Sequence, residues 1–302
     1  AGALTYTGAI TGESSVDDTL SLDNGADVSG GAIANVEALT LSTGASVRLS
    51  AAQNQGFTGA ITAPGTGMGG ETIAVSGDGA LTTLANVENY AIEDDSTDAR
   101  TVTLTHADTN VTANSVTDAI TFNAGALTYT GAIIGESTVD DTLGLDNGAD
   151  VSGGVISNVE ALTLIAGASV RLSVQQNQGF TGTVVAPGTG VNGEDITIVG
   201  DGAVTTLAQV EKYTIEDDST NARPVTIIQA NTHVTAPSNT DAVIFNIGAL
   251  TYTGAIIGES TVDDTLSLDT DADVSGGTIT NVKALTLSSG ASVRLSAQQN
   301  QG

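Results

Sequence analysis

The sequence predicts an all-β protein built as a parallel β-solenoid (β-helix). Three observations predict this fold: the chain repeats itself every 123 residues, short runs inside each repeat alternate apolar and polar residues, and aromatic residues make up only 3% of the composition. Few large side chains favour a thin core, and 37 glycines provide many turns. These features are typical of stacked coils that each add one layer to a narrow tube.

The long repeat is read directly from the chain. Segment 1–10 returns at 124–133 and, with one change at its first residue, at 247–256, so the offset is 124 − 1 = 123 both times. Neither end shows an atypical capping repeat, so we expect a longer array that continues in both directions. The predicted organisation is repeat 1 (1–123), repeat 2 (124–246) and partial repeat 3 (247–302).

The strands are predicted from period-two alternation, as in 18–23, 37–42, 45–50 and 101–105. Turn formers such as Pro64 and its following glycine separate these runs. The steps between runs are mostly 16 to 19 residues, and 123 divided by seven is about 17.6, which predicts about seven coils per repeat. The runs begin near Leu4, Leu20, Leu39, Phe57, Ile73 and Tyr90.

Tandem β-sandwich domains are the alternative architecture, since they also fit a period of 123 residues. Such domains usually bury a Trp or Tyr core, and this chain has no Trp. A sandwich array also leaves the shorter spacing unexplained, whereas a solenoid accounts for both spacings.

Charge and composition exclude several classes of function. Seven basic residues against 35 acidic ones give a net charge of −28, which repels phosphate backbones and anionic membranes. We therefore expect no nucleic-acid partner and no membrane insertion, and no run approaches the roughly 20 apolar residues of a bilayer span. The absence of cysteine excludes disulfides, thiolate nucleophiles and cysteine-based zinc sites.

A resemblance to known proteins rests on segment 16–23 followed by 26–31, 35–41 and 44–47. This pattern resembles the Thr- and Asp-rich strand repeats of bacterial surface-layer proteins and giant repeat adhesins, some of which are related to calcium-binding RTX proteins. The resemblance covers nearly the whole chain and implies a location outside the cell, at its surface. The residues before Asp18 lack the RTX spacing Gly-Gly-x-Gly-x-Asp, so RTX-type calcium binding is not implied.

Calcium remains a candidate ligand because it accepts about six to eight oxygens from carboxylates, carbonyls and water. Adjacent aspartates in a strand point to opposite faces, so each doublet offers one side chain to a given ion. A solvated acidic face is the alternative interpretation, and we expect no other cofactor. The candidate ligands are Glu93, Asp94, Asp95, Asp98, Glu216, Asp217, Asp218, Asp17, Asp18, Asp140, Asp141, Asp263 and Asp264.

Most of the basic residues also follow the repeat. They are interpreted either as docking points for a neighbouring rod or as local salt bridges. The amide tract that begins at Gln53 predicts a polar corner loop. The periodic arginines are Arg48, Arg171 and Arg294 at one position, and Arg100 and Arg223 at another.

No catalytic motif is present, and neither His106 nor His233 is repeated, so the chain is not expected to be an enzyme. The predicted function is a structural rod or filament segment of a large extracellular bacterial surface protein. Its partners would be neighbouring copies or the continuation of the same chain. The alternative is an adhesin that recognises a glycan or a partner cell, although Tyr6, Tyr129 and Tyr252 are predicted to face the core rather than a sugar.

Overall fold

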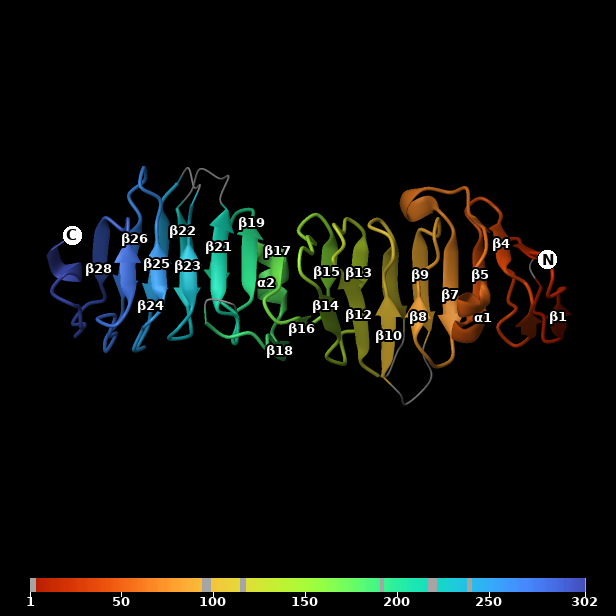
Figure 1. The fold of residues 1–302 in the computed structure, drawn as a ribbon, viewed down its shortest axis with the longest axis horizontal. Helices are drawn as coiled ribbons and strands as arrows, with labels where there is room; N and C mark the ends of the chain where they lie inside the picture. The colour runs from red at the N-terminus through yellow and green to blue at the C-terminus, as the bar shows by residue number, and fades with distance from the viewer. Residues whose placement is uncertain are drawn as a thin grey trace. The chain divides into compact units, whose positions relative to one another are not determined.

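A computed structural model describes residues 4–93, 99–114, 118–190, 193–216, 222–237 and 241–301. The chain forms two compact units, and each is described by itself. Both are built from parallel strands stacked as a β-solenoid, with about 12 turns in total and only 6% helix (Figure 1). The predicted fold is therefore confirmed, and parallel pairing excludes the antiparallel sandwich alternative. Unit 1 consists of Ala1–Gly144 and Gly153–Ala161, and unit 2 of Leu145–Ser152 and Leu162–Gly302.

The main wall of unit 1 is a parallel sheet in the order β15-β13-β11-β9-β7-β5. Its strands are β5 (Ser46–Ser50), β7 (Thr72–Ser76), β9 (Asn89–Glu93), β11 (Asn110–Asn114), β13 (Ala132–Ile134) and β15 (Val155–Ser157). The other strands of unit 1 are β1 (Ala9–Thr11), β2 (Thr19–Leu22), β3 (Ala32–Ala34), β4 (Ala38–Leu41), β6 (Ile61–Thr62), β8 (Leu81–Thr82), β10 (Arg100–Thr103) and β12 (Ile120–Gly125). Two strands hold residues of both units, namely β14 (Thr142–Leu145) and β16 (Ala161–Leu164).

Unit 2 repeats this arrangement. One wall has the order β17-β19-β21-β23-β25-β27 and the other the order β20-β22-β24-β26-β28. The first wall comprises β17 (Ser169–Ser173), β19 (Asp195–Val199), β21 (Lys212–Glu216), β23 (His233–Thr235), β25 (Ala255–Ile257) and β27 (Thr278–Thr280). The second comprises β20 (Val204–Thr205), β22 (Arg223–Ile227), β24 (Val243–Ile247), β26 (Thr265–Leu268) and β28 (Ala284–Leu287), while β18 (Val184–Val185) pairs with β16.

The coils are longer than the sequence predicted. One core column of unit 1 runs from Val47 to Ile156 in five steps, which gives coils of about 22 residues on average. Unit 2 has the same column, in five steps from Val170 to Ile279. The prediction of seven coils per repeat is therefore wrong. It counted successive strands on different walls as successive coils: Ile73 stacks on Val47, not on the run that begins near Phe57, whose Ile61 stacks on Leu39.

Coil length also varies within a repeat. The step from Ser46 to its partner Thr72 spans more of the chain than the next step, from Thr72 to Asn89. The longer coil contains α1 (Ala51–Gly56), a short helix that starts with a reciprocal capping box between Ser50 and Gln53. The equivalent helix in unit 2 is α2 (Val174–Gly179), and 3-10 turns lie at η1 (Gly67–Gly69) and η3 (Gln299–Gln301).

The first coils of unit 1 do not continue the main wall directly. Ile10 pairs with Ile33 in a separate two-stranded sheet. Asp27, which precedes the second strand of that sheet, is the residue that bridges to Arg48 in β5. Ile33 lies closer to Val47 in the chain than the length of even the shortest coil of the main wall, so the chain shifts its register before this wall begins.

The core is filled mainly by stacked Val, Leu and Ile side chains that alternate with outward-facing polar residues. The aromatic residues occupy the same interior. Tyr129 and Tyr252 are fully buried, as predicted, whereas Tyr6 is partly exposed. The hydroxyl of Tyr252 donates a hydrogen bond to the Thr232 carbonyl at 2.7 Å, so the one polar atom of this ring is satisfied inside the core.

Candidate functional site

The acidic doublets were the main sequence candidates, and each divides between surface and interior. Asp140 and Asp263 are exposed, whereas their neighbours Asp141 and Asp264 are 0% exposed. Asp17 is likewise exposed and the adjoining Asp18 is half-buried. The prediction that each doublet offers one side chain to either side therefore holds, although the doublets lie just before strands rather than within them.

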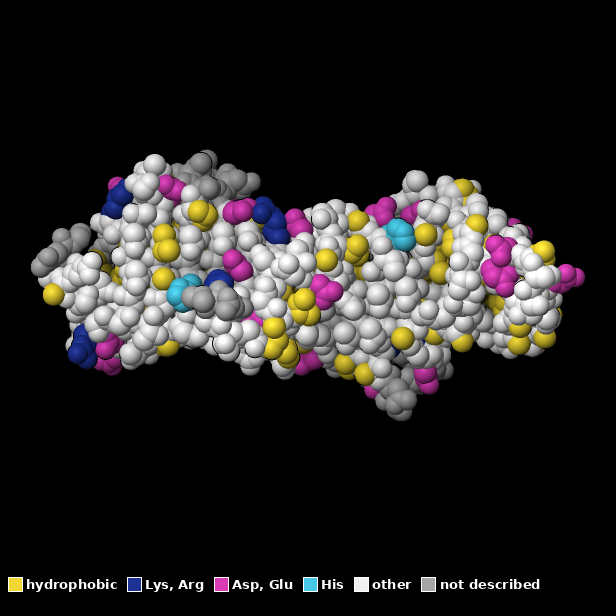
Figure 2. Space-filling model, viewed as in Figure 1, with side chains coloured by type: hydrophobic (Ala, Val, Ile, Leu, Met, Phe, Trp, Pro, Cys, Tyr) yellow, Lys and Arg dark blue, Asp and Glu magenta, His cyan; other side chains and the backbone are white. Residues whose placement is uncertain are grey.

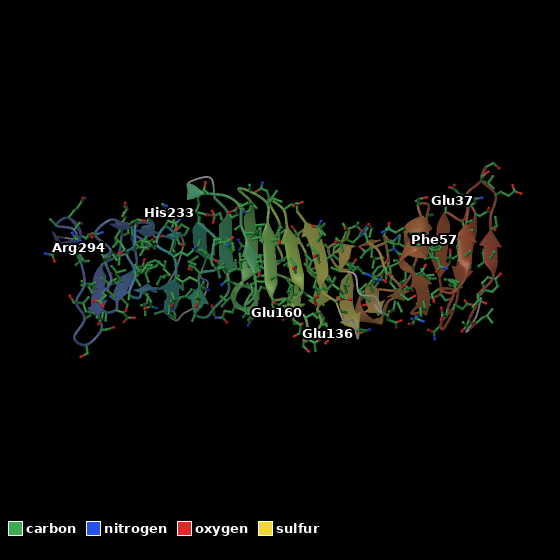
Figure 3. All side chains as sticks on the ribbon, turned by 90° about the horizontal axis from the view of Figure 1, so that it is seen from below. Glu37, Phe57, Glu136, Glu160, His233 and Arg294 are labelled. Atoms are coloured by element: carbon green, nitrogen blue, oxygen red, sulfur yellow. The ribbon has the colours of Figure 1, made fainter. Side chains whose placement is uncertain are left out.

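The buried aspartate of each doublet fastens a loop to the coil beside it. In unit 1, Asp141 accepts the Ile120 N–H at 2.6 Å with Oδ1 and the Glu136 N–H at 2.7 Å with Oδ2. Burial raises the pKa of Asp141, and the negative charges of Glu160 and Glu136 raise it further, against these two hydrogen bonds. Figure 3 labels Glu136 and Glu160, which lie near each other along the lower edge of that view. Both oxygens thus already have donors.

The charged residue on the next coil beside this loop differs between copies. In unit 1 the Asp141 N–H donates to Glu160 Oε2 at 3.3 Å, and the Asp18 N–H donates in the same way to Glu37 at 3.2 Å. In unit 2 the equivalent position is Lys283, whose ammonium donates to the Val262 carbonyl at 2.7 Å. Lys283 also lies 3.4 Å from the carboxylate of the exposed Asp263.

Glu93 and Glu216 form ion pairs along the outer wall of their units. Arg48 Nε lies 2.7 Å from Glu93, two coils away, and Arg48 also reaches Asp27 on the preceding coil at 3.8 Å. Ala74 is the strand residue that pairs with Arg48 on the coil between them. Arg171 repeats the arrangement with Glu216 at 2.6 Å. These local salt bridges agree with one of the two interpretations given to the periodic arginines.

Other periodic residues lie inside the molecule rather than on its surface. Arg100 and Arg223 are 2% and 1% exposed, so they do not present docking points. The predicted polar corner loop is wrong: the tract forms α1, and Gln53 and Asn54 are buried. The Gln53 amide donates to the Val28 carbonyl at 2.7 Å, and Asn54 accepts a 3.3 Å hydrogen bond from the Tyr90 hydroxyl. The amides thus satisfy backbone and ring groups of neighbouring coils.

Five of the calcium candidates lie outside the described residues: Asp94, Asp95, Asp98, Asp217 and Asp218. Among the residues that the structure does describe, no three His, Asp or Glu side chains converge as a metal site would require. Figure 2 shows the carboxylates as small scattered groups on the visible face. Calcium binding therefore stays a prediction.

Unit 2 contains an open groove of about 560 Å³ beside the end of α2. Threonine hydroxyls and amides line it together with apolar side chains, including Phe180, Thr183, Leu207, Gln209 and Ile228. Ile228 is 47% exposed, and its counterpart in repeat 1 is Thr105, 228 − 123 = 105. Sequence reasoning did not single out this groove.

Sequence reasoning also missed two stacked glutamate pairs, Glu71 with Glu88 and Glu194 with Glu211. The signal was present, because the Asn-Val-Glu run that ends at Glu37 recurs at Glu88, 88 − 37 = 51 residues later. In both places the glutamate accepts a backbone N–H from an acidic residue on the coil below, Asp18 or Glu71. The recurrence of the Asn-Val-Glu run therefore corresponds to a recurrence of the same glutamate-to-backbone contact.

Within the described ranges, no helix is long and apolar enough to cross a membrane. Comparison with family models, with curated proteins and with solved structures finds no match to this chain.

Proposed function

We propose that this chain is a structural, non-enzymatic segment of a large extracellular bacterial surface protein, in which stacked coils build a rod or filament. The observation that carries the proposal is the matching core column of each unit, in which five coil steps lead from Val47 to Ile156 and again from Val170 to Ile279. A spacer needs only continued stacking, and a repeat that rebuilds the same column provides it.

The outer wall supports the same role. The Arg48 side chain joins three coils, those of Asp27, its own strand and Glu93, and Arg171 joins the corresponding coils in unit 2. A side chain that links non-adjacent coils opposes their separation along the solenoid axis. Its contribution is modest, because exposed ion pairs stabilise by less than about 1 kcal/mol.

The test is the length of chains carrying one, two and three complete repeats, measured by small-angle scattering. At about 22 residues and about 4.8 Å per coil, each added repeat should lengthen the molecule by about 27 Å. A maximum dimension that fails to increase in equal steps would contradict the rod. Antibody labelling of intact cells tests the surface location separately, and labelling only after lysis would contradict it.

Self-association with neighbouring copies belongs to the same proposal. A net charge of −28 makes such copies repel one another, so calcium or another divalent cation would have to bridge them. We expect calcium to promote association and a chelator to reverse it, as followed by analytical ultracentrifugation. Association that is insensitive to both reagents would contradict a cation bridge.

A second candidate function is a binding module for a surface glycan, favoured by the hydroxyl- and amide-lined groove of unit 2. Titration with oligosaccharides, followed by NMR, should then shift resonances of groove residues. Thr183→Ala removes a groove hydroxyl and should weaken the effect. Repeat 1 already has Ala60 at the same position. Shifts spread evenly over both units would contradict a site in the groove.

A further inference from the structure

Each unit has two glutamates that stack on neighbouring coils; both are buried in unit 2, whereas in unit 1 Glu71 is buried and Glu88 is partly exposed. In unit 2, Glu194 is 0% exposed and Glu211 is 8% exposed. The strand residues that follow them, Asp195 and Lys212, are paired across β19 and β21, which places the glutamates one above the other. Paired strands are spaced by about 4.8 Å, so the two carboxyl groups lie on adjacent layers of the same wall.

Of the four carboxyl oxygens of Glu71 and Glu194, three accept hydrogen bonds from backbone N–H groups. Glu194 Oε1 accepts the Gly188 N–H at 2.7 Å and the Gly167 N–H at 3.2 Å. In contrast, Oε2 of Glu194 and Oε2 of Glu211 are both buried and have no hydrogen-bond partner among the described residues. Two bare carboxylate oxygens side by side in the interior would be strongly destabilising.

The surrounding loop lies close against both carboxyl groups. A Cβ atom added to Gly193 would lie 2.6 Å from Glu211 Oε2, and one added to Gly188 would lie 2.6 Å from Glu194 Oε1. The glycine backbone therefore contacts the carboxyl groups, and a side chain at either position would overlap them.

We propose that each glutamate pair shares one proton in the folded protein, and that loss of this proton as pH rises loosens the glycine loop held over the pair. A single O–H between Glu194 Oε2 and Glu211 Oε2 supplies the donor that both oxygens lack. It also leaves one negative charge in the interior instead of two. Unit 1 carries the corresponding pair, Glu71 and Glu88, in a more open form: Glu71 Oε2 accepts the Gly65 N–H at 2.9 Å and Glu88 Oε2 accepts the Glu71 N–H at 3.2 Å.

The electrostatics agree with this geometry. Burial raises the pKa of Glu211, and the adjacent Glu194 raises it further; burial and Glu71 act in the same way on the pKa of Glu88. A glutamate whose pKa is higher in the folded state binds its proton more tightly when folded. Its contribution to stability is thus complete below the ordinary glutamate pKa and is lost as pH rises through the raised value.

Other charged groups near the pair differ between the units. In unit 2 they are Asp195 and Lys212 on the same strands and His233 on the next coil, which pairs with Lys212. Unit 1 has the neutral residues Thr72, Asn89 and Asn110 at those three positions. Asp108 is an ionisable residue near Asn110 on its next coil. The preceding turns and covering loops, 43–45 with 63–70 and 165–168 with 186–190, carry no ionisable side chain. The same titration in both units would therefore exclude Lys212 and His233 as its cause.

The experiment uses the whole chain. Carbon-13 NMR of the glutamate carboxyl carbons from pH 4 to 9 should reveal resonances that titrate well above that of the exposed Glu13, and these should change in Glu88→Gln and Glu211→Gln. A glutamine amide donates to the partner carboxylate as the shared proton does. Each unit of pKa elevation corresponds to about a tenfold change in the folding equilibrium, so the unfolding temperature of the double variant should fall less steeply as pH rises.

Glu13→Gln is the matched control, because it removes one negative charge from an exposed side chain. Its unfolding temperature should fall with rising pH as steeply as that of the unmodified chain. The proposal is overturned if every glutamate carboxyl titrates with Glu13, or if the double variant declines as steeply as the control. Should the double variant fail to fold, the titration of the unmodified chain decides the question alone.

Discussion

The loop fastened by Asp141 in unit 1 and the loop fastened by Asp264 in unit 2 have the same backbone contacts but opposite charges above them. Both aspartates accept two N–H donors at 2.6 and 2.7 Å. The residue above is Glu160 in one case and Lys283 in the other. Glu160 raises the pKa of Asp141, whereas Lys283 lowers that of Asp264, although burial keeps both raised.

The difference shows which contacts hold the loop. Because the geometry is unchanged when a carboxylate is replaced by an ammonium, the two backbone donors fix the aspartate, and the charge above only adjusts its proton affinity. A charged position in a repeat can therefore vary while the buried contact beneath it stays constant.

The largest effect is expected from removing the buried carboxylate itself. Asp141→Ala leaves two N–H groups without acceptors in the interior and should lower the free energy of unfolding by about 3 kcal/mol. Asp264→Ala should do the same, as measured by urea denaturation. The exposed neighbour provides the control: Asp140→Ala should change stability by no more than about 0.5 kcal/mol. Equal losses from Asp140→Ala and Asp141→Ala would refute the buried role.

Exchanging the charges should have a smaller effect. Glu160→Lys should stabilise the protein at neutral pH by about 0.5 to 1 kcal/mol, and Lys283→Glu should destabilise it similarly. The raised pKa of Asp141 means that stability falls as pH rises through it, so Glu160→Lys should also reduce this fall. Unfolding temperatures between pH 4 and 8 measure both. No change in their pH dependence would mean that the charge above does not act on the aspartate.

The smallest effect is expected at the outer wall. Arg48→Ala removes a half-exposed ion pair with Glu93 and should cost about 0.5 kcal/mol, less in high salt. Arg294, which is 76% exposed and pairs with Asp273, serves as a comparison whose alanine variant should matter less still. Denaturation at low and high salt would separate the two, and a salt-independent loss would point to packing instead.

Much of the fold was predictable because alternation identifies inward residues without knowing the wall to which they belong. Leu39, Val47 and Tyr129 are buried as their pattern requires. Coil length was not predictable in this way: strands on different walls have the same alternation, so Ile73 looks in sequence like the next layer after the run at Phe57, although the structure stacks it on Val47.

The candidate site was predictable only in part, for a similar reason. The doublet at Asp140 and Asp141 contains two adjacent charges, and strand geometry already separates them. Glu71 and Glu88 lie a whole coil apart in the chain, and the recurring Asn-Val-Glu run indicates that Glu88 repeats the contact of Glu37 but not that Glu71 is its partner. Their contact depends on one short coil following one long coil, which is a property of the whole repeat.

The register shift before β5 determines what a neighbour of this protein would encounter. Ile10 and Ile133 are equivalent in sequence, 133 − 10 = 123, yet Ile133 belongs to the column of Val47 and Ile10 does not. The sequence period and the coil period therefore do not match within unit 1. Side chains at equivalent sequence positions thus do not form one continuous column along this unit, so a partner that follows one column contacts different positions of the repeat.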